Sequence, residues 1–147
     1  YLKYFNKLKI NPSILMEVKE FSKKFDENTV SIHIRSWRDD DVRKGNFHRL
    51  EKFIAETKKF DENTTFYLTS DSDEIKSVFK DLYGDRVFIY DRKSETATSR
   101  VNPFGIQEDF IEMLLLSKNN YIIGTYLSTY TEAAWWFGGA KAEVRVC

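Results

Sequence analysis

Several features that would narrow the function of a chain are missing from this sequence. Its one cysteine, Cys147, is the last of the 147 residues, so an internal disulfide and a cysteine metal site are both excluded. A single cysteine fits a reducing compartment, which favours a cytoplasmic location. We recognise no signal peptide, and no apolar run reaches the ~18 residues that a membrane span requires. A membrane-spanning protein is therefore not expected.

An excess of charge of one sign is also missing. The 23 lysines and arginines balance the 23 aspartates and glutamates. Proteins that bind nucleic acid broadly usually carry a clustered basic excess, so a nucleic-acid partner is disfavoured. A neutral chain can still hold one anionic ligand through a local cluster of cations.

Glycines are few, and their spacing matches no nucleotide-binding motif. A dinucleotide-binding domain carries G-x-G-x-x-G after its first strand, and a P-loop needs a similar glycine-rich turn. Neither pattern occurs, so an oxidoreductase that uses a nicotinamide cofactor is disfavoured. The six glycines are Gly45, Gly84, Gly105, Gly124, Gly138 and Gly139.

What the sequence does contain is an alternation of strand and helix patterns along its whole length. A chain of this size forms one domain. Alternating strands and helices predict an α/β fold, a Rossmann-like three-layer domain with a mostly parallel sheet of about five strands. The polar stretch Asp91–Pro103 is predicted to be a mobile loop. The strands are predicted at Thr29–Arg35, Thr64–Thr69, Arg86–Tyr90, Tyr121–Gly124 and Glu143–Val146, and the helices at Pro12–Phe25, Phe47–Phe60, Asp71–Tyr83, Gly105–Ser117 and Ser128–Phe137.

The end of the first predicted strand brings an imidazole and a guanidinium together. Residues Thr29–Arg35 alternate in polarity, so His33 and Arg35 share one face. Ligands of open α/β sheets bind at the carboxyl ends of strands, and the fork of arginine matches a phosphate. His33 is either a base poised near neutral pH or a hydrogen-bonded structural residue. Arg35 either contacts a ligand or pairs internally with Asp39, Asp40 or Asp41.

Two further strand ends are polar and point the same way in the predicted sheet. Asp71 and Asp73 follow the second strand, and Ser128 and Thr129 stand where a helix begins after the fourth. Free N–H groups and hydroxyls at a helix start form an anion site. Both places can equally be helix caps, with Glu74 and Glu132 completing capping boxes. The tract Trp135–Phe137 is predicted to pack in the core.

These segments together resemble the donor-binding half of fucosyltransferases, the group that includes α-1,6 and nodulation fucosyltransferases. The family's H-x-R motif matches His33-Ile34-Arg35, and its strand closing on a Thr/Ser-Asp pair matches Phe66–Asp73. Its third segment, D-x-x-x-L-S followed by a strand and a Ser/Thr-rich helix start, matches Glu112–Ser117 and then Ser128–Ala134. Two positions depart from the pattern. Arg38 precedes the acid Asp39 in the first motif, and Glu112 replaces the usual aspartate.

The resemblance implies one lobe of a two-lobed GT-B glycosyltransferase, the C-terminal lobe that binds GDP-fucose, with the second lobe missing from this chain. It implies a nucleotide sugar and a glycan acceptor as partners, and neither a cofactor nor a metal. The alternative is a non-catalytic α/β module that binds a nucleotide, or a metal through Asp71 or Asp73. By resemblance, Arg35 binds the diphosphate and acts in catalysis with His33 beside it. Ser128 and Thr129 bind phosphate oxygens, and Asp109 or Glu112 contacts the guanine or ribose. Further donor contacts are implied for Asp71, Asp73 and Tyr130.

Overall fold

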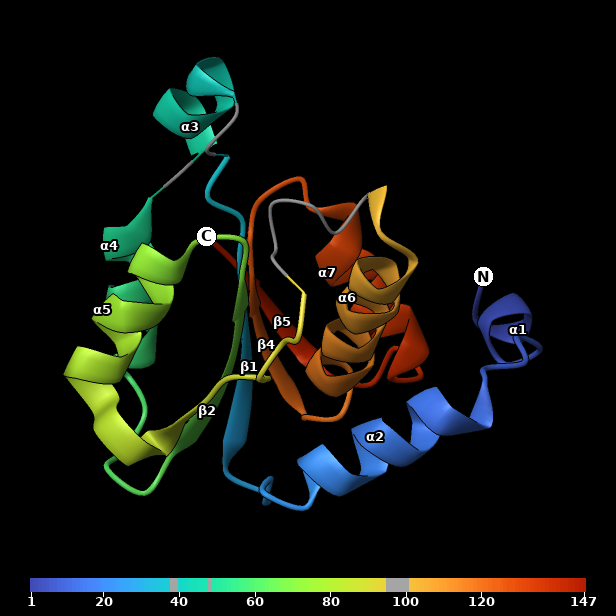
Figure 1. Cartoon of the computed structure of the whole chain (residues 1–147). Helices are drawn as coiled ribbons and strands as arrows, with labels where there is room; N and C mark the ends of the chain where they lie inside the picture. The colour runs from blue at the N-terminus through green and yellow to red at the C-terminus, as the bar shows by residue number, and fades with distance from the viewer. Residues whose placement is uncertain (38–39, 48, 95–100) are drawn as a thin grey trace.

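The computed structural model describes residues 1–37, 40–47, 49–94 and 101–147. Within them a central sheet lies between two layers of helices (Figure 1). All neighbouring strands are parallel, in the order β3-β2-β1-β4-β5. The predicted Rossmann-like α/β fold with about five parallel strands is therefore confirmed. The strands are β1 (Thr29–Ile34), β2 (Thr65–Ser70), β3 (Val87–Phe88), β4 (Tyr121–Gly124) and β5 (Glu143–Val146).

The helices divide between the two faces of the sheet. In Figure 1, α4 and α5 cover one face, α2, α6 and α7 cover the other, and α3 stands apart from this body. No helix in the described ranges is long and apolar enough to cross a membrane. The helices are α1 (Leu2–Phe5), α2 (Pro12–Ser22), α3 (Asp41–Phe47), α4 (Leu50–Thr57), α5 (Asp73–Tyr83), the 3₁₀ turn η1 (Gly84–Arg86), α6 (Pro103–Leu116) and α7 (Thr129–Phe137).

Most boundaries agree with the prediction to within two or three residues, and the differences have local causes. Helix α6 begins two residues early because the Asn102 side chain caps it and Pro103 fits its first turn. The single helix predicted over Phe47–Phe60 is wrong: Phe47 ends α3, and α4 starts separately at Leu50. The short helix α1 was not predicted. His48 lies outside the described residues.

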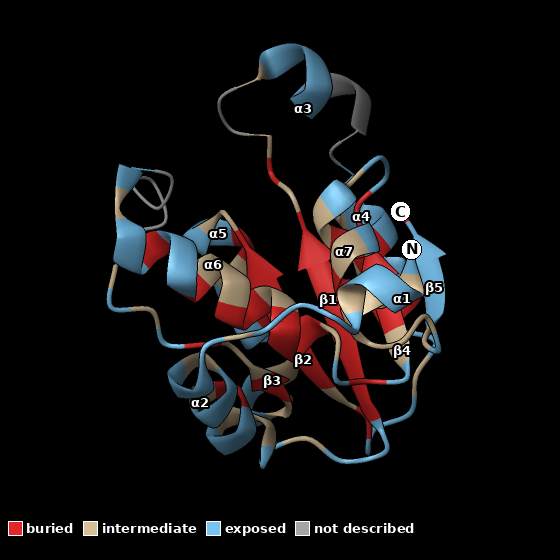
Figure 2. Ribbon diagram, turned by 90° about the vertical axis from the view of Figure 1, so that its right-hand side faces the viewer, coloured by how far each residue is buried: buried red, intermediate tan, exposed pale blue. Residues whose placement is uncertain are grey.

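The central strand β1 is buried on both faces (Figure 2). Ile32 and Ile34 point into an apolar core beneath α4 and α5, together with Phe53 and Phe79. The alternate positions face α6 and α7, as the alternation predicted. That face is polar, and its groups are satisfied internally: the Ser31 hydroxyl donates to the carbonyl of Leu116 at 2.8 Å. Burying a polar side chain without a partner is costly, so these bonds fix how α6 lies on the sheet.

A buried ion cluster anchors the segment after β3, where the sequence predicted a mobile loop. The Arg92 side chain is only 6% exposed and donates to Asp109 and Glu112, at 2.5 Å to each. Glu108 accepts from the backbone of Lys93 and from Ser94. Burial raises the pKa of the Glu112 carboxyl, and Arg92 opposes this increase only in part. Residues 91–94 are therefore held on α6, and residues 95–100 of the predicted loop lie outside the described ranges.

Replacing Arg92 by methionine should destabilise the fold in a pH-dependent way. The variant leaves Glu112 as a buried carboxylate without its cation, which costs about 3–5 kcal/mol when one partner of a buried pair is removed. The pKa of Glu112 is higher in the folded chain than in the unfolded chain. The loss of stability is therefore small at a pH below the pKa of Glu112 in the unfolded chain, and it grows as the pH rises. Urea unfolding at neutral pH and at about pH 4.5 measures the difference.

The matched control is Arg145→Met, which removes an arginine whose side chain is 58% exposed and paired with Glu56. It should change stability little at either pH. An Arg92→Met variant that loses the same stability at both pH values would contradict the assigned role of the cluster.

Candidate functional site

The predicted site residues meet where the strand order changes direction, between β1 and β4. Arg35 follows β1, Asp71 follows β2 and Thr125 follows β4, all at the carboxyl edge of the sheet. This is the topological switch point, where open parallel sheets bind ligands. The prediction that the three polar strand ends lie at one edge is confirmed.

Arg35 is paired with Asp71. Their side chains approach to 3.2 Å, with 33% of the Arg35 side chain and 11% of the Asp71 side chain exposed. The other Asp71 oxygen accepts from the backbone N–H of Ser36 at 2.7 Å. Asp71 thus fixes both the guanidinium and the backbone that carries it, while leaving part of the guanidinium open to a ligand.

Two sequence-based interpretations of this region are corrected. The sequence left open whether Arg35 contacts a ligand or pairs with Asp39, Asp40 or Asp41. Its partner is Asp71 instead, Asp40 pairs with Arg43, and Asp39 lies outside the described residues. Asp71 is also not a helix cap with Glu74. Ser72 caps α5 by accepting from the N–H of Ile75, because the helix starts two residues later than predicted.

His33 is buried against α7. Its Nδ1 lies 2.8 Å from the Thr131 hydroxyl and 3.4 Å from the Ser128 hydroxyl, and its ring is 4.7 Å from the Tyr130 ring. Burial lowers the pKa of His33 to about 4; Asp71 opposes the shift and Arg35 adds to it. The imidazole is therefore neutral at neutral pH. Its pKa lies far below the range that suits a general base near neutral pH.

The start of α7 has the predicted cap. The Ser128 hydroxyl accepts from the N–H of Thr131, and Thr129 is the exposed first residue of the helix. Glu132 is one position too far along for a capping box with Ser128, and it accepts from the indole of Trp136. A helix start carries more donors than one cap satisfies, so the cap is compatible with a phosphate site.

Thr125 holds the ends of β1 and β4 together, a role that the sequence did not indicate. Its hydroxyl donates to the carbonyl of His33 at 2.9 Å and accepts from the N–H of Arg35 at 2.8 Å. Next to it, a Cβ on Gly124 would lie 2.3 Å from the Thr131 side chain. Only glycine allows Thr131 to approach β4 so closely, which brings its hydroxyl to His33.

Tyr130 links this edge to the Arg92 cluster. Its hydroxyl donates to the carbonyl of Asp109 at 2.6 Å, and Glu112 accepts from Thr69 at 3.2 Å. The carboxylate of Asp109 is one-third exposed, whereas that of Glu112 is buried. Arg92 itself was missed, because an isolated arginine in a polar stretch gives no periodic signal.

Asp73 is not brought into this group. Its side chain is 94% exposed and pairs with Lys76 on the same helix at 3.1 Å. Within the described residues, no three His, Cys, Asp or Glu side chains gather in a way that suits a metal ion. The alternative of a metal bound through Asp71 or Asp73 therefore gains no support from this part of the chain.

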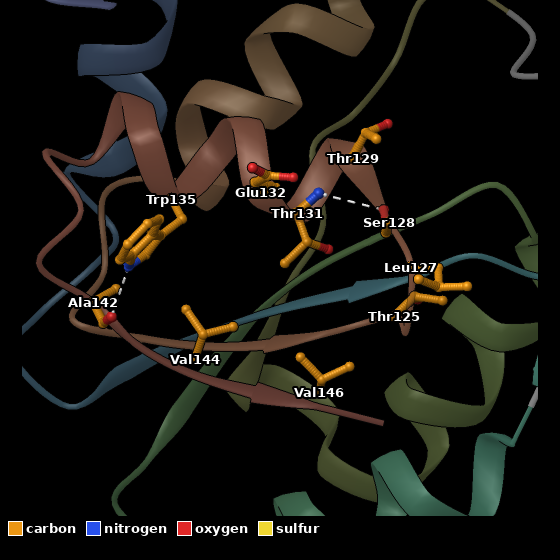
Figure 3. Close-up of a pocket in the computed structure, with 10 residues that line it drawn as sticks. All are labelled: Thr125, Leu127, Ser128, Thr129, Thr131, Glu132, Trp135, Ala142, Val144 and Val146. Atoms are coloured by element: carbon orange, nitrogen blue, oxygen red, sulfur yellow. Dashed lines mark hydrogen bonds between the residues drawn. The ribbon is translucent and has the colours of Figure 1, made fainter. Parts of the chain in front are cut away.

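A groove of about 490 Å³ adjoins the start of α7 on its β5 side (Figure 3). Its wall at one end is the indole of Trp135, whose N–H donates to the carbonyl of Ala142 at 3.0 Å. Trp135, which was predicted to pack in the core, is half-buried and packs against the apolar cluster beneath α2, α6 and α7. The lining residues are Thr125, Leu127, Ser128, Thr129, Thr131, Glu132, Trp135, Ala142, Val144 and Val146.

Comparison with known proteins gives matches in structure but not in sequence. No protein-family model matches this chain, and no curated protein matches it either. Among solved structures, the NodZ α-1,6-fucosyltransferase soaked with GDP-fucose has a TM-score of 0.63 at 19% identity, covering 90% of this chain and 44% of that one. The same enzyme from Bradyrhizobium gives a TM-score of 0.61 at 19% identity, with 88% and 43% covered.

A second fucosyltransferase structure matches at still lower identity. POFUT1 in complex with GDP has a TM-score of 0.61 at 9% identity, covering 95% of this chain and 47% of that one. At such identities the likeness shows the fold. This chain therefore has the α/β fold of a fucosyltransferase lobe, and it spans less than half the length of each of these solved chains.

Proposed function

We propose that this chain is the donor-binding lobe of a GT-B fucosyltransferase and holds GDP-fucose for transfer of fucose to a glycan acceptor. The observation that carries the proposal is the partly exposed Arg35 guanidinium at the switch point, next to a strand end that hydrogen-bonds to the start of α7. Guanidinium and helix N–H groups are the two protein features best suited to a diphosphate. Two of the neighbours named above are solved with GDP-fucose or GDP, which supports the same ligand class.

In this proposal Arg35 and the start of α7 stabilise the departing nucleotide. The acceptor hydroxyl attacks the anomeric carbon of fucose, the bond from that carbon to the diphosphate oxygen breaks, and the electron pair leaves with GDP. Arg35 and the N–H groups near Ser128 and Thr129 neutralise the charge that develops on the diphosphate. We assign the acceptor proton to a base on the second lobe, because His33 is weakly basic and the Asp71 carboxylate is already engaged by Arg35 and Ser36.

The remaining residues bind or position the donor. We assign contact with the nucleoside to Tyr130 and the partly exposed Asp109, and Glu112 supports Asp109 through Arg92. Asp71 orients Arg35. Asp73 stays in its outer ion pair with Lys76 and takes no part.

A non-catalytic nucleotide-binding module is the second candidate. It is favoured by the low pKa of His33, which leaves this imidazole a weak base. Such a module binds GDP but transfers no fucose even when joined to the rest of its protein. Transfer assays on the longest natural form of the protein separate the two candidates.

Arg35→Gln should abolish most of the affinity for GDP. A hydrogen bond to a charged group contributes about 1.5–3 kcal/mol, so the dissociation constant should rise roughly 10- to 100-fold. Calorimetric titration with GDP and GDP-fucose measures it, with ADP and UDP as tests of base selectivity. Asp71→Asn is the matched control, since its amide oxygen still accepts from Ser36 while the charge next to Arg35 is removed.

The control variant should retain or strengthen GDP binding, because Arg35 loses its internal competitor. Two outcomes contradict the proposal. One is a wild-type chain that binds none of the nucleotides, and the other is an Arg35→Gln variant that binds GDP as the wild type does.

His33 should remain neutral down to about pH 5, well below its usual pKa of 6.5. Because burial holds its folded pKa near 4, protonation favours the unfolded chain once the pH falls below 6.5. The wild type should then lose about 3 kcal/mol more stability than His33→Gln between neutral pH and pH 4.

NMR titration of the two histidines follows the same ionisation directly, and the His33→Gln variant assigns the resonances. GDP-fucose has no phosphate ionisation in this range, because both of its phosphates are esterified, so its affinity should not change with a midpoint near 6.5. A resonance of His33 that titrates near that pH would show that the imidazole is not buried as described.

A further inference from the structure

The indole of Trp37 lies against two arginine side chains at the carboxyl edge of the sheet. The Arg35 guanidinium carbon is 5.5 Å from the indole centroid, and that of Arg43, on α3, is 5.0 Å away. A guanidinium within about 6 Å of an indole is attracted to its π-system. Trp37 therefore keeps Arg43 near the arginine that we assign to the diphosphate.

The indole is held in a conformation that is unfavourable for tryptophan. The backbone φ of Trp37 is 54°, in the left-handed region, and the buried Nε1 of its indole has no hydrogen-bond partner among the described residues. Both features cost free energy and persist only where surrounding contacts determine them. Two guanidinium groups around one ring are such contacts.

The described edge needs another cation to hold a diphosphate. Arg35 is balanced by Asp71, and His33 is neutral, so these three side chains carry no net charge. A nucleoside diphosphate carries several negative charges. Arg43 is available to it, because among the described residues its guanidinium contacts one carboxylate, that of Asp40 at 3.3 Å, and both of these side chains are well exposed. Exposed ion pairs of this kind are weak and exchange readily for a better anion.

Building on the proposed donor site, we propose that Arg43 is its second anion-binding side chain. It binds a phosphate oxygen beside the one that Arg35 binds, and Trp37 positions it. Helix α3, which carries Arg43, stands clear of the α/β body beyond the end of β1 (Figures 1 and 2). A ligand at the carboxyl edge can therefore be approached from α3 without displacing a core element.

The test compares Arg43→Gln with Lys44→Gln, which removes the same charge from the next position of the same exposed helix. Calorimetry measures binding of GDP, GMP and inorganic pyrophosphate to each. We expect Arg43→Gln to weaken GDP and pyrophosphate about tenfold and GMP less, as loss of one charge-assisted contact predicts. Lys44→Gln should change each affinity by less than about twofold.

A double-mutant cycle tests the role of Trp37. If Trp37 acts by positioning Arg43, Trp37→Ala should weaken GDP binding, and adding Arg43→Gln to it should weaken binding little further. Fully additive losses would show that Trp37 does not position Arg43.

The outcomes separate this inference from the proposed function. If GDP binds selectively and Arg43→Gln has no effect, or if Lys44→Gln has an equal effect, the assignment of Arg43 is overturned while the donor site stands. If pyrophosphate binding depends on Arg43 but GDP is not preferred over ADP or UDP, the anion site stands and the GDP-fucose assignment falls. A wild type that binds neither GDP nor pyrophosphate overturns both.

Discussion

The requirement that the polar face of β1 be satisfied inside the protein determines how the candidate site is built. β1 is the middle strand of the sheet and is covered by helices on both sides, so Ser31 and His33 cannot reach water. Each therefore bonds to the α6–β4–α7 half of the fold: Ser31 to the end of α6, and His33 to Thr131 on α7. Thr125, which follows β4, also joins the two halves through hydrogen bonds to the backbone at the end of β1. These bonds set the separation of β1 and α7, and hence the shape of the edge where Arg35 emerges.

Arg35, Asp71 and His33 together carry no net charge at this edge when no ligand is bound. Asp71 holds Arg35 in place and at the same time cancels its charge. The buried imidazole next to them is kept neutral by desolvation. The ligand-free edge is thus stable without an anion. In the proposed donor site, a diphosphate competes with Asp71 for the guanidinium and gains by also contacting the start of α7. The proposal therefore predicts that the whole diphosphate is recognised better than any single carboxylate.

The sequence predicted the architecture well because strand and helix periods are local properties. β4 and β5 have the predicted bounds, and the meeting of His33, Arg35, Asp71 and Ser128 at one edge follows from parallel topology alone. Long-range partners could not be predicted. The pairing of Arg35 with Asp71 joins residues from adjacent strands, while sequence proximity suggested the aspartates of its own loop. Likewise, Arg92 meets carboxylates that project from one face of α6, and nothing near Arg92 in the sequence marks that encounter.

The outer strand β5 has a consequence for how the chain behaves at high concentration. It lies at one edge of the sheet, and no described strand pairs with its outer side. Val144 and Val146 are 37% and 47% exposed along the groove beside α7. An open strand edge with apolar side chains is a template for pairing with another molecule. The charged side chains of Glu143 and Arg145 oppose such association, because pairing with a second copy would bury them. Self-association of the chain should therefore depend on these two charges more than on the sheet's apolar core.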